Sequence, residues 1–148
     1  MVRLGRQNLP PENYTAYLVS CILHELQDAM TILIAEDDFT VREHLALILE
    51  FADYTVLSAR SGLEAIALSR SYRQPIDLLI TDIRMPGVDG LTLAGLLQHQ
   101  RPDTPVIFMS ADLEQHRLPD QAVSIEKPFS ARDILDLVAS RSPVHSVD

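Results

Sequence analysis

From Thr31 onward, short apolar runs alternate with segments whose apolar residues recur at helical spacing. The runs have the length and the β-branched content of strands. They lie at Thr31–Ala35, Tyr54–Ala59, Ile76–Thr81, Pro105–Met109 and, more weakly, Ala122–Ile125. Strands that alternate with helices run parallel, because each crossover returns the chain to the same edge of the sheet. The alternation therefore predicts an α/β fold, a doubly wound five-stranded parallel sheet with helices on both faces.

Four segments between and after these runs each have one apolar face. The faces comprise Val41, Leu45, Ile48, Leu49 and Ala52; Leu63, Ile66 and Ala67; Leu93, Ala94, Leu96 and Leu97; and Ile134, Leu137 and Val138. Capping signals precede three of them, namely Thr40 with Glu43, Ser61 with Glu64 and, in a weaker form, Ser130 with Asp133. We therefore predict helices that begin at these places.

The segment from Asp112 to Gln121 differs from the other connections. It contains Pro119 and little apolar periodicity, and only 16 residues separate Ser110 from Lys127. A loop, a full helix and a second loop hardly fit into that length. We predict that the fourth helix is short, distorted or absent.

The chain of 148 residues has room for one domain. We assign residues 30–141 to it, 1–29 to an N-terminal extension and 142–148 to a frayed tail. After Pro10-Pro11 the extension has apolar residues that fit one face of a helix: Tyr14, Tyr17, Leu18, Cys21, Ile22 and Leu26. Met30 directly precedes the first strand, so the extension is either an appended helix or an over-long choice of start codon.

Composition excludes several classes of protein. A net charge of −9 argues against a protein that binds nucleic acid by neutralising phosphates. The single cysteine, Cys21, excludes a disulfide framework, and no histidine pair has the spacing of a zinc site. No apolar run approaches the roughly 20 residues of a membrane span. We expect a cytoplasmic protein that acts on neither nucleic acid nor membrane.

Polar residues follow four of the five apolar runs. The first run ends in Glu36 and Asp37, the third in Asp82, the fourth in Ser110 and the fifth in Lys127. In an open parallel sheet these positions share the edge at which ligands bind. Clustered carboxylates repel one another and call for a cation, and oxygen-only ligands suit Mg²⁺. A carboxylate beside Mg²⁺ can attack phosphorus and form an acyl phosphate, whose oxygens an ammonium and a hydroxyl can hold.

Four segments in this order and spacing resemble the receiver domain of two-component response regulators. Residues 32–38 read ILIAEDD, residues 77–90 read DLLITDIRMPGVDG, residues 106–111 read VIFMSA and residues 127–129 read KPF. The resemblance covers about residues 31 to 140. It implies a flavodoxin-like sheet with the strand order 2-1-3-4-5.

The resemblance also implies roles for the residues of the site. Asp82 is the expected phosphoacceptor, and Ser110 and Lys127 would bind the phosphoryl group. The expected metal ligands for Mg²⁺, with Mn²⁺ as the alternative ion, are Glu36, Asp37 (the more direct of the acidic pair), Asp82 and the backbone carbonyl of Arg84. Asp38 aligns with a variable position and is expected to be an outward-facing helix cap. The Lys127-Pro128 bond is expected to be cis, as is typical of the family.

Two positions near the site raise separate questions. Ser124 stands where the family normally has a Tyr or Phe that turns inward on phosphorylation, so the switch is either different or weak. Arg84 and Asp112 lie two residues after Asp82 and Ser110, where the family tunes the lifetime of the phosphoryl group. One hypothesis is an ion pair between them that hinders water; the other is two solvated charges.

The leading functional prediction is a single-domain response regulator or phosphorelay receiver. Its expected partners are a sensor histidine kinase or histidine phosphotransfer protein and an unknown downstream protein, and it would act by binding or by onward phosphotransfer. It would catalyse only its own phosphorylation and dephosphorylation. The alternative is a phosphorylation-independent interaction module on the same scaffold. The sequence disfavours a phosphatase with an aspartyl nucleophile, because such an enzyme typically needs a second acid at the position of Arg84. Whether the chain is stand-alone or a fragment of a hybrid kinase stays open.

Overall fold

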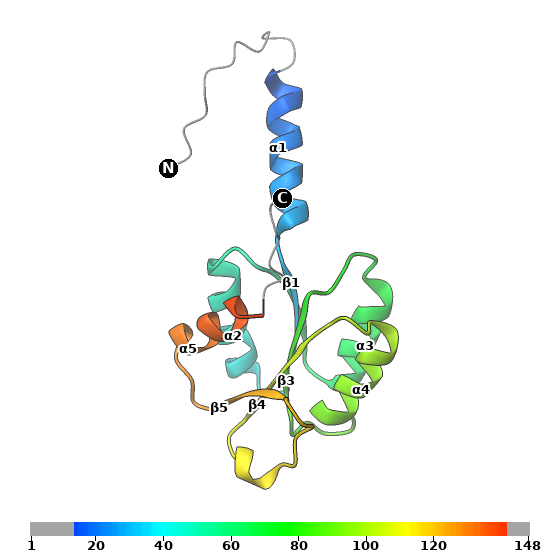
Figure 1. Cartoon of the computed structure of the whole chain (residues 1–148), viewed down its shortest axis with the longest axis vertical. Coiled ribbons are helices and arrows are strands. Elements are labelled where there is room, and N and C mark those ends of the chain that lie inside the picture. The colour runs from blue at the N-terminus through cyan, green and yellow to red at the C-terminus, as the bar shows by residue number, and fades with distance from the viewer. Residues whose placement is uncertain (1–13, 142–148) are drawn as a thin grey trace.

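Five strands form one parallel sheet in the order β2-β1-β3-β4-β5 in the computed structural model, which describes residues 14–141 (Figure 1). The strands are β1 (Thr31–Ala35), β2 (Thr55–Ala59), β3 (Leu78–Asp82), β4 (Val106–Ser110) and β5 (Val123–Glu126). All four neighbouring pairs are parallel, so the carboxyl ends of the strands share one edge. The predicted doubly wound sheet and its strand order are confirmed.

Helices cover both faces of this sheet, as predicted. Helices α2 (Phe39–Phe51) and α5 (Ala131–Ala139) lie on one face, and α3 (Gly62–Ser71) and α4 (Gly90–Gln100) lie on the other (Figure 1). All residues of β1 and β3 are buried. The core on the first face includes Ile32, Ile34, Leu45, Leu49, Ile80, Ile134 and Val138, and that on the second includes Leu33, Ala65, Leu79, Leu93 and Leu97. The central strands are therefore rigid supports for the residues at their carboxyl ends.

Helix α2 begins two residues earlier than its capping signal predicts. The Asp38 carboxylate caps it by accepting a hydrogen bond from the backbone N–H of Val41. The prediction that Thr40 and Glu43 begin this helix is wrong, because Thr40 already lies inside the first turn. The expectation that Asp38 is a helix cap is confirmed.

The other two capping signals act where they were predicted. The Ser61 hydroxyl accepts a hydrogen bond from the backbone N–H of Glu64 at the start of α3. Ser130 and Asp133 form a complete reciprocal capping box at the start of α5, although the acid there is the shorter aspartate. Both caps satisfy backbone groups that the first turn of a helix leaves free.

No α-helix connects β4 to β5. The connection holds only the 3₁₀ turn η2 (Leu113–Gln115), followed by an irregular loop. Leu113, Leu118 and Ala122 from this connection pack partly buried against a small cluster that contains Ala94 and Phe108. The prediction that the fourth helix, the one between the fourth and fifth strands, is short or distorted is confirmed, and a loop replaces most of it.

A further helix, α1 (Tyr14–Asp28), precedes the sheet and extends beyond the amino end of β1 (Figure 1). All residues from Tyr14 to Leu23 are exposed, whereas Met30, at the junction with β1, is buried. Pro10-Pro11 and the predicted tail at residues 142–148 lie outside the described residues. Within residues 14–141, no helix combines the length and the apolar character that crossing a membrane requires.

Candidate functional site

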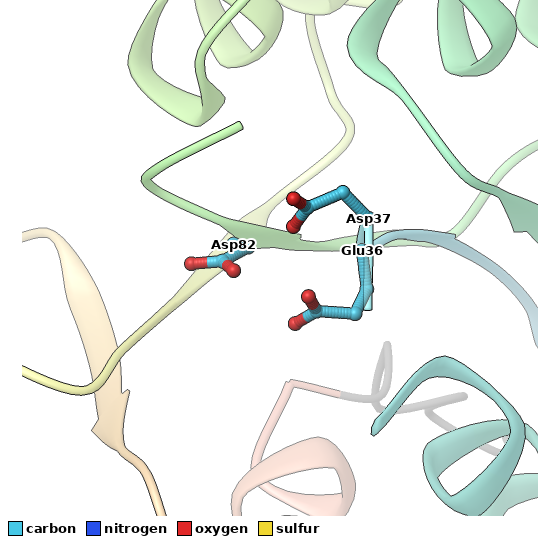
Figure 2. A group of neighbouring side chains, drawn as sticks. All are labelled: Glu36, Asp37 and Asp82. Atoms are coloured by element: carbon cyan, nitrogen blue, oxygen red, sulfur yellow. The ribbon is translucent and has the colours of Figure 1, made fainter. Parts of the chain in front are cut away.

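Three carboxylates meet at the carboxyl ends of β1 and β3. Glu36 and Asp37 directly follow β1, and Asp82 is the last residue of β3. One oxygen from each carboxylate lies within 4.8 Å of the other two (Figure 2). Glu36 is fully buried and Asp82 is 8% exposed, whereas Asp37 is exposed. The cluster therefore opens to solvent on the side of Asp37.

The ammonium of Lys127 joins two of these carboxylates. Its Nζ donates to Oε2 of Glu36 at 2.6 Å and to Oδ2 of Asp82 at 2.8 Å. Lys127 follows β5, at the edge of the sheet, and its side chain is 19% exposed. The peptide bond between Lys127 and Pro128 is cis, as expected. The long side chain thus reaches two strands that are not its neighbours in the sheet.

Burial dominates the electrostatics of Glu36. It raises the pKa of the Glu36 carboxyl from 4.5 to about 7, and the charge of Asp82 acts in the same direction. Hydrogen bonds from Lys127 and from the backbone N–H of Asp38 oppose this rise in the pKa. For Lys127, burial lowers the pKa of the ammonium, but the hydrogen bonds to Asp82 and Glu36 outweigh it and the net direction is upward. Lys127 therefore stays charged at neutral pH, and Glu36 ionises only as the pH rises through about 7.

This donor set fits a hard divalent cation. Carboxylate oxygens are the ligands that Mg²⁺ prefers, and three of them converge without a nitrogen or sulfur donor among the three. A cation would also offset the repulsion between Glu36 and Asp82 that raises the Glu36 pKa. Arg84, the fourth expected ligand, lines a pocket of about 440 Å³ together with Asp37.

Ser110 ends β4 at the same edge of the sheet. It is 4% exposed, and its Oγ accepts a hydrogen bond of 3.0 Å from the backbone N–H of Asp112. Its carbonyl accepts from the backbone N–H of Lys127 at 2.8 Å. Asp82 pairs with Met109 in the sheet, so Ser110 lies one residue beyond the level of the acid. The Ser110 hydroxyl has one acceptor position in use within the described residues and is still available as a donor.

The side chain of Arg84 has a different partner from the one expected. It donates a hydrogen bond of 2.7 Å to Oε1 of Gln115, at the end of η2. Among residues 14–141 it forms no ion pair with Asp112, so the hypothesis of an Arg84–Asp112 bridge is wrong for this structure. The partner of Arg84 lies three residues after the expected one, because the turn η2 brings Gln115 rather than Asp112 to Arg84. No sequence signal marked Gln115.

Two further features of the site were missed by the sequence interpretation. The Thr81 hydroxyl, fully buried, donates to the carbonyl of Asp82 at 2.9 Å. Gly90, the first residue of α4, lies directly against that same carbonyl, and a Cβ atom there would overlap it. The Asp-Gly pair at 89–90 indicated a turn, but no sequence signal marked the close packing of the Gly90 backbone against the Asp82 carbonyl.

Ser124 lies in β5 opposite Phe108 and is half-buried. It lies within a regular strand, two residues before Glu126 ends that strand.

His116, which follows η2, lines the 440 Å³ pocket beside Asp37 and Arg84. Its Nε2 is the only buried side-chain nitrogen or oxygen without a hydrogen-bond partner in the described part of the chain. No function had been assigned to it from the sequence.

Comparison with known proteins identifies the same domain. The family model of the response regulator receiver domain matches residues 32–139. The chain is 36% identical over 110 residues to the response regulator receiver protein CpdR of Brucella abortus, covering 71% of the chain and 90% of CpdR. It is also 36% identical over 123 residues to the response regulator protein FleR of Pseudomonas aeruginosa, covering 75% of the chain but only 24% of FleR.

Solved structures agree with these sequence relatives. The receiver domain of the hybrid histidine kinase CckA has a TM-score of 0.67 at 32% identity, covering 75% of the chain and 97% of that domain. The response regulator TrrA of Thermotoga maritima, solved in complex with Mg²⁺-BeF, has a TM-score of 0.67 at 29% identity, covering 76% of the chain and 98% of TrrA. Over residues 32–139, this chain belongs to the response regulator receiver domain family of two-component systems.

Proposed function

We propose that Asp82 accepts a phosphoryl group from the phosphohistidine of a sensor histidine kinase or a histidine phosphotransfer protein. The observation that carries the proposal is the convergence of three carboxylates within 4.8 Å, one of them 2.8 Å from the Lys127 ammonium. The acids supply a nucleophile and metal ligands, and Lys127 supplies a fixed positive charge. This combination suits in-line transfer of a phosphoryl group.

In the proposed step, the Asp82 oxygen that is not bonded to Lys127 attacks the phosphorus. A P–O bond forms while the P–N bond to the donor imidazole breaks, and the imidazole nitrogen leaves with the electron pair. The product is an acyl phosphate on Asp82. Lys127 neutralises the phosphoryl oxygens from the position it holds beside Asp82. The Ser110 hydroxyl, at the end of β4, donates a hydrogen bond to the same group.

Glu36, Asp37, Asp82 and the backbone carbonyl of Arg84 would hold Mg²⁺, or Mn²⁺ in its place. When bound, the ion supplies positive charge and orients the phosphoryl oxygens. The response regulator TrrA was solved in complex with Mg²⁺-BeF, which supports magnesium as the ion. Glu36 has a second task, because its 2.6 Å hydrogen bond directs the Lys127 ammonium toward Asp82.

The acyl phosphate would bias a two-state protein surface toward a downstream partner, or its phosphoryl group would pass onward. We place this activity in the cytoplasm, where a kinase could present phosphohistidine. The similarity extends over 90% of CpdR, a response regulator receiver protein, which supports a single-domain receiver. Catalysis would be limited to the chain's own phosphorylation and dephosphorylation.

Intact-protein mass after incubation with acetyl phosphate tests the proposal. With Mg²⁺ we expect the chain to gain one phosphoryl group, and without Mg²⁺ or in Asp82→Asn we expect no gain. Asp103→Asn is the matched control, because Asp103 is exposed and precedes β4 at the opposite edge of the sheet. This variant should gain the group as the wild type does.

A folded wild type that gains no group from acetyl phosphate, and does not bind the beryllofluoride mimic with Mg²⁺, would overturn the proposal. It would favour a phosphorylation-independent interaction module instead. Binding of the mimic without gain from acetyl phosphate would indicate a site that requires its own donor protein. A gain that persists in Asp82→Asn would assign the phosphoryl group to another residue.

A further inference from the structure

Helix α1 presents apolar side chains that nothing in the described chain covers. Six large ones are each between 42% and 55% exposed: Tyr14, Tyr17, Leu18, Val19, Ile22 and Leu23. The helix has 15 residues and is about 22 Å long. A lone helix of this length is marginal in water, and helices of proteins owe most of their stability to packing. The helix therefore calls for a partner surface.

The β4–β5 connection, which holds no α-helix, leaves a groove on the opposite side of α4 from α3. Its volume is about 660 Å³. One wall is a helical stripe of α4 (Leu91, Ala94, Gly95 and Gln98), the other is the loop from Arg117 to Ala122, and the floor includes Val106 and Phe108 of β4. The walls and floor are mostly apolar or small side chains. The groove has the form and chemistry of a helix-binding site.

Gly95, in the wall of this groove, leaves room for another backbone to approach. A glycine inside a helix lowers its stability by roughly 0.5–1 kcal/mol relative to alanine. No contact within the described chain requires that glycine, because a Cβ atom there would meet nothing within 4 Å. Next to it, Ala94 is also small. Two small residues at the middle of a helical stripe let a second helix pack closely.

Charge distinguishes the occupant. Two exposed arginines, Arg117 and Arg141, and one exposed acid, Asp120, line the groove, so its lining is net positive in a chain whose net charge is −9. The only charged residues in the sequence of α1 are Glu25 and Asp28, both acidic and both near its carboxyl end. The negative end of the helix dipole adds to their charge. Apolar character and charge thus both match α1 to the groove.

We propose that α1 of a second copy of this chain docks in the groove between α4 and the β4–β5 loop. Each copy donates its α1 and accepts that of its partner, which gives a closed two-fold dimer. The chain's own α1 projects beyond the amino end of β1, from which only Ala29 and the buried Met30 separate it (Figure 1). The proposal does not depend on phosphorylation.

Sedimentation and light scattering of the full chain over a wide range of concentration test the proposal. We expect a reversible dimer whose dissociation constant rises about tenfold or more in Ile22→Glu and in Gly95→Trp. Gly95→Trp fills the groove from a position with open space, so the monomer fold should survive, as circular dichroism would verify. Leu47→Glu is the control, because Leu47 is 63% exposed on α2, on the other face of the sheet. It should leave the dimer unchanged.

The occupant can be identified directly through Cys21, the only cysteine of the chain and exposed on α1. A benzophenone maleimide attached there should cross-link, on irradiation, to α4 or to the loop from Arg117 to Ala122 of the other copy. A chain that stays monomeric at every concentration would overturn the proposal. So would a dimer that Gly95→Trp leaves intact and whose cross-links join α1 to α1.

Discussion

The ammonium of Lys127 donates a hydrogen bond of 2.8 Å to Oδ2 of Asp82, although the two lie 45 positions apart in the sequence. Lys127 follows β5 and Asp82 ends β3, with β4 between these strands. The same ammonium donates to Glu36 at 2.6 Å. The Lys127 ammonium thus fixes the positions of two carboxylates, that of the proposed nucleophile Asp82 and that of the expected metal ligand Glu36.

Removal of this ammonium should slow phosphorylation far more than it alters the fold. We expect Lys127→Ala to lower the rate of phosphoryl gain from acetyl phosphate about a hundredfold, as loss of one preorganised electrostatic donor does elsewhere. Arg132→Ala is the matched control, because it removes an exposed cation whose ion-pair partner is Asp136 on the same helix. Equal rates for wild type and Lys127→Ala would remove Lys127 from the proposed mechanism.

The Ser110 hydroxyl should contribute a smaller part of the same rate. We expect Ser110→Ala to lower it about tenfold, because one neutral hydrogen bond to the phosphoryl group is lost. Ser110→Thr keeps the hydroxyl and should keep most of the rate. Thermal melts of both variants separate this effect from the loss of the acceptor for the Asp112 backbone N–H. If Ser110→Thr were as slow as Ser110→Ala, packing at the end of β4 would be the cause.

Burial of Glu36 should make the metal-free domain less stable as the pH rises. In the folded chain its pKa is about 7, against 4.5 as its ordinary value, so the folded state binds more protons between these values. Stability from this group is present below pH 4.5 and is lost as the pH approaches 7. Lys127, whose pKa is raised from 10.5, contributes a change only above that value.

Glu36→Gln isolates this contribution, because it removes the ionisable group and keeps the shape. In EDTA, we expect the variant to gain stability over wild type between pH 4.5 and 7, by on the order of 3 kcal/mol in total. Urea unfolding at a series of pH values measures the difference. A difference that stays constant over this range would mean that Glu36 titrates normally.

Mg²⁺ should stabilise the folded chain through the three carboxylates. An ion that binds only the folded state adds about 1.4 kcal/mol at ten times its dissociation constant. We expect the melting temperature to rise with Mg²⁺ in wild type and to change little in Asp37→Asn, because the exposed member of the cluster is then neutral. Asp103→Asn should respond to Mg²⁺ as the wild type does. An equal response in Asp37→Asn would exclude Asp37 as a ligand.

The polar edge of this sheet was predictable because it depends on strand order alone. Once the runs at 31–35 and 76–81 were parallel neighbours, Glu36, Asp37 and Asp82 had to share an edge. The cap of α2 was less predictable, because Asp38 and Thr40 both carry suitable oxygens. The choice depends on where the chain leaves β1, which is set by tertiary packing and not by local sequence.

Contacts made by the β4–β5 connection could not be read from the sequence. Arg84 donates a hydrogen bond to Gln115 because the turn η2, which directly follows Asp112, brings Gln115 next to Arg84. The spacing of Arg84 and Asp112 from two strand ends suggested a pair, but irregular backbone does not preserve such spacing. Likewise, the pKa of Glu36 depends on how much water the folded chain excludes, which composition does not reveal.

Gly90 makes the tightest backbone contact of the site, and its replacement should be costly. A Cβ atom there would overlap the carbonyl oxygen of Asp82, and the loop that follows β3 would have to move. We expect Gly90→Ala to lower the free energy of unfolding by roughly 1–3 kcal/mol, as overpacking does. Because the displaced atom belongs to the proposed phosphoacceptor, phosphorylation should slow as well.

Gly95→Ala in the same helix separates this effect from the general preference of helices for alanine. Its Cβ would meet nothing within 4 Å, so we expect a gain in stability of roughly 0.5–1 kcal/mol and an unchanged rate of phosphorylation. Urea unfolding should be followed at a concentration at which light scattering finds monomers. If Gly90→Ala were as stable as Gly95→Ala, the loop after β3 would be soft enough to yield, and close packing of Gly90 would not position Asp82.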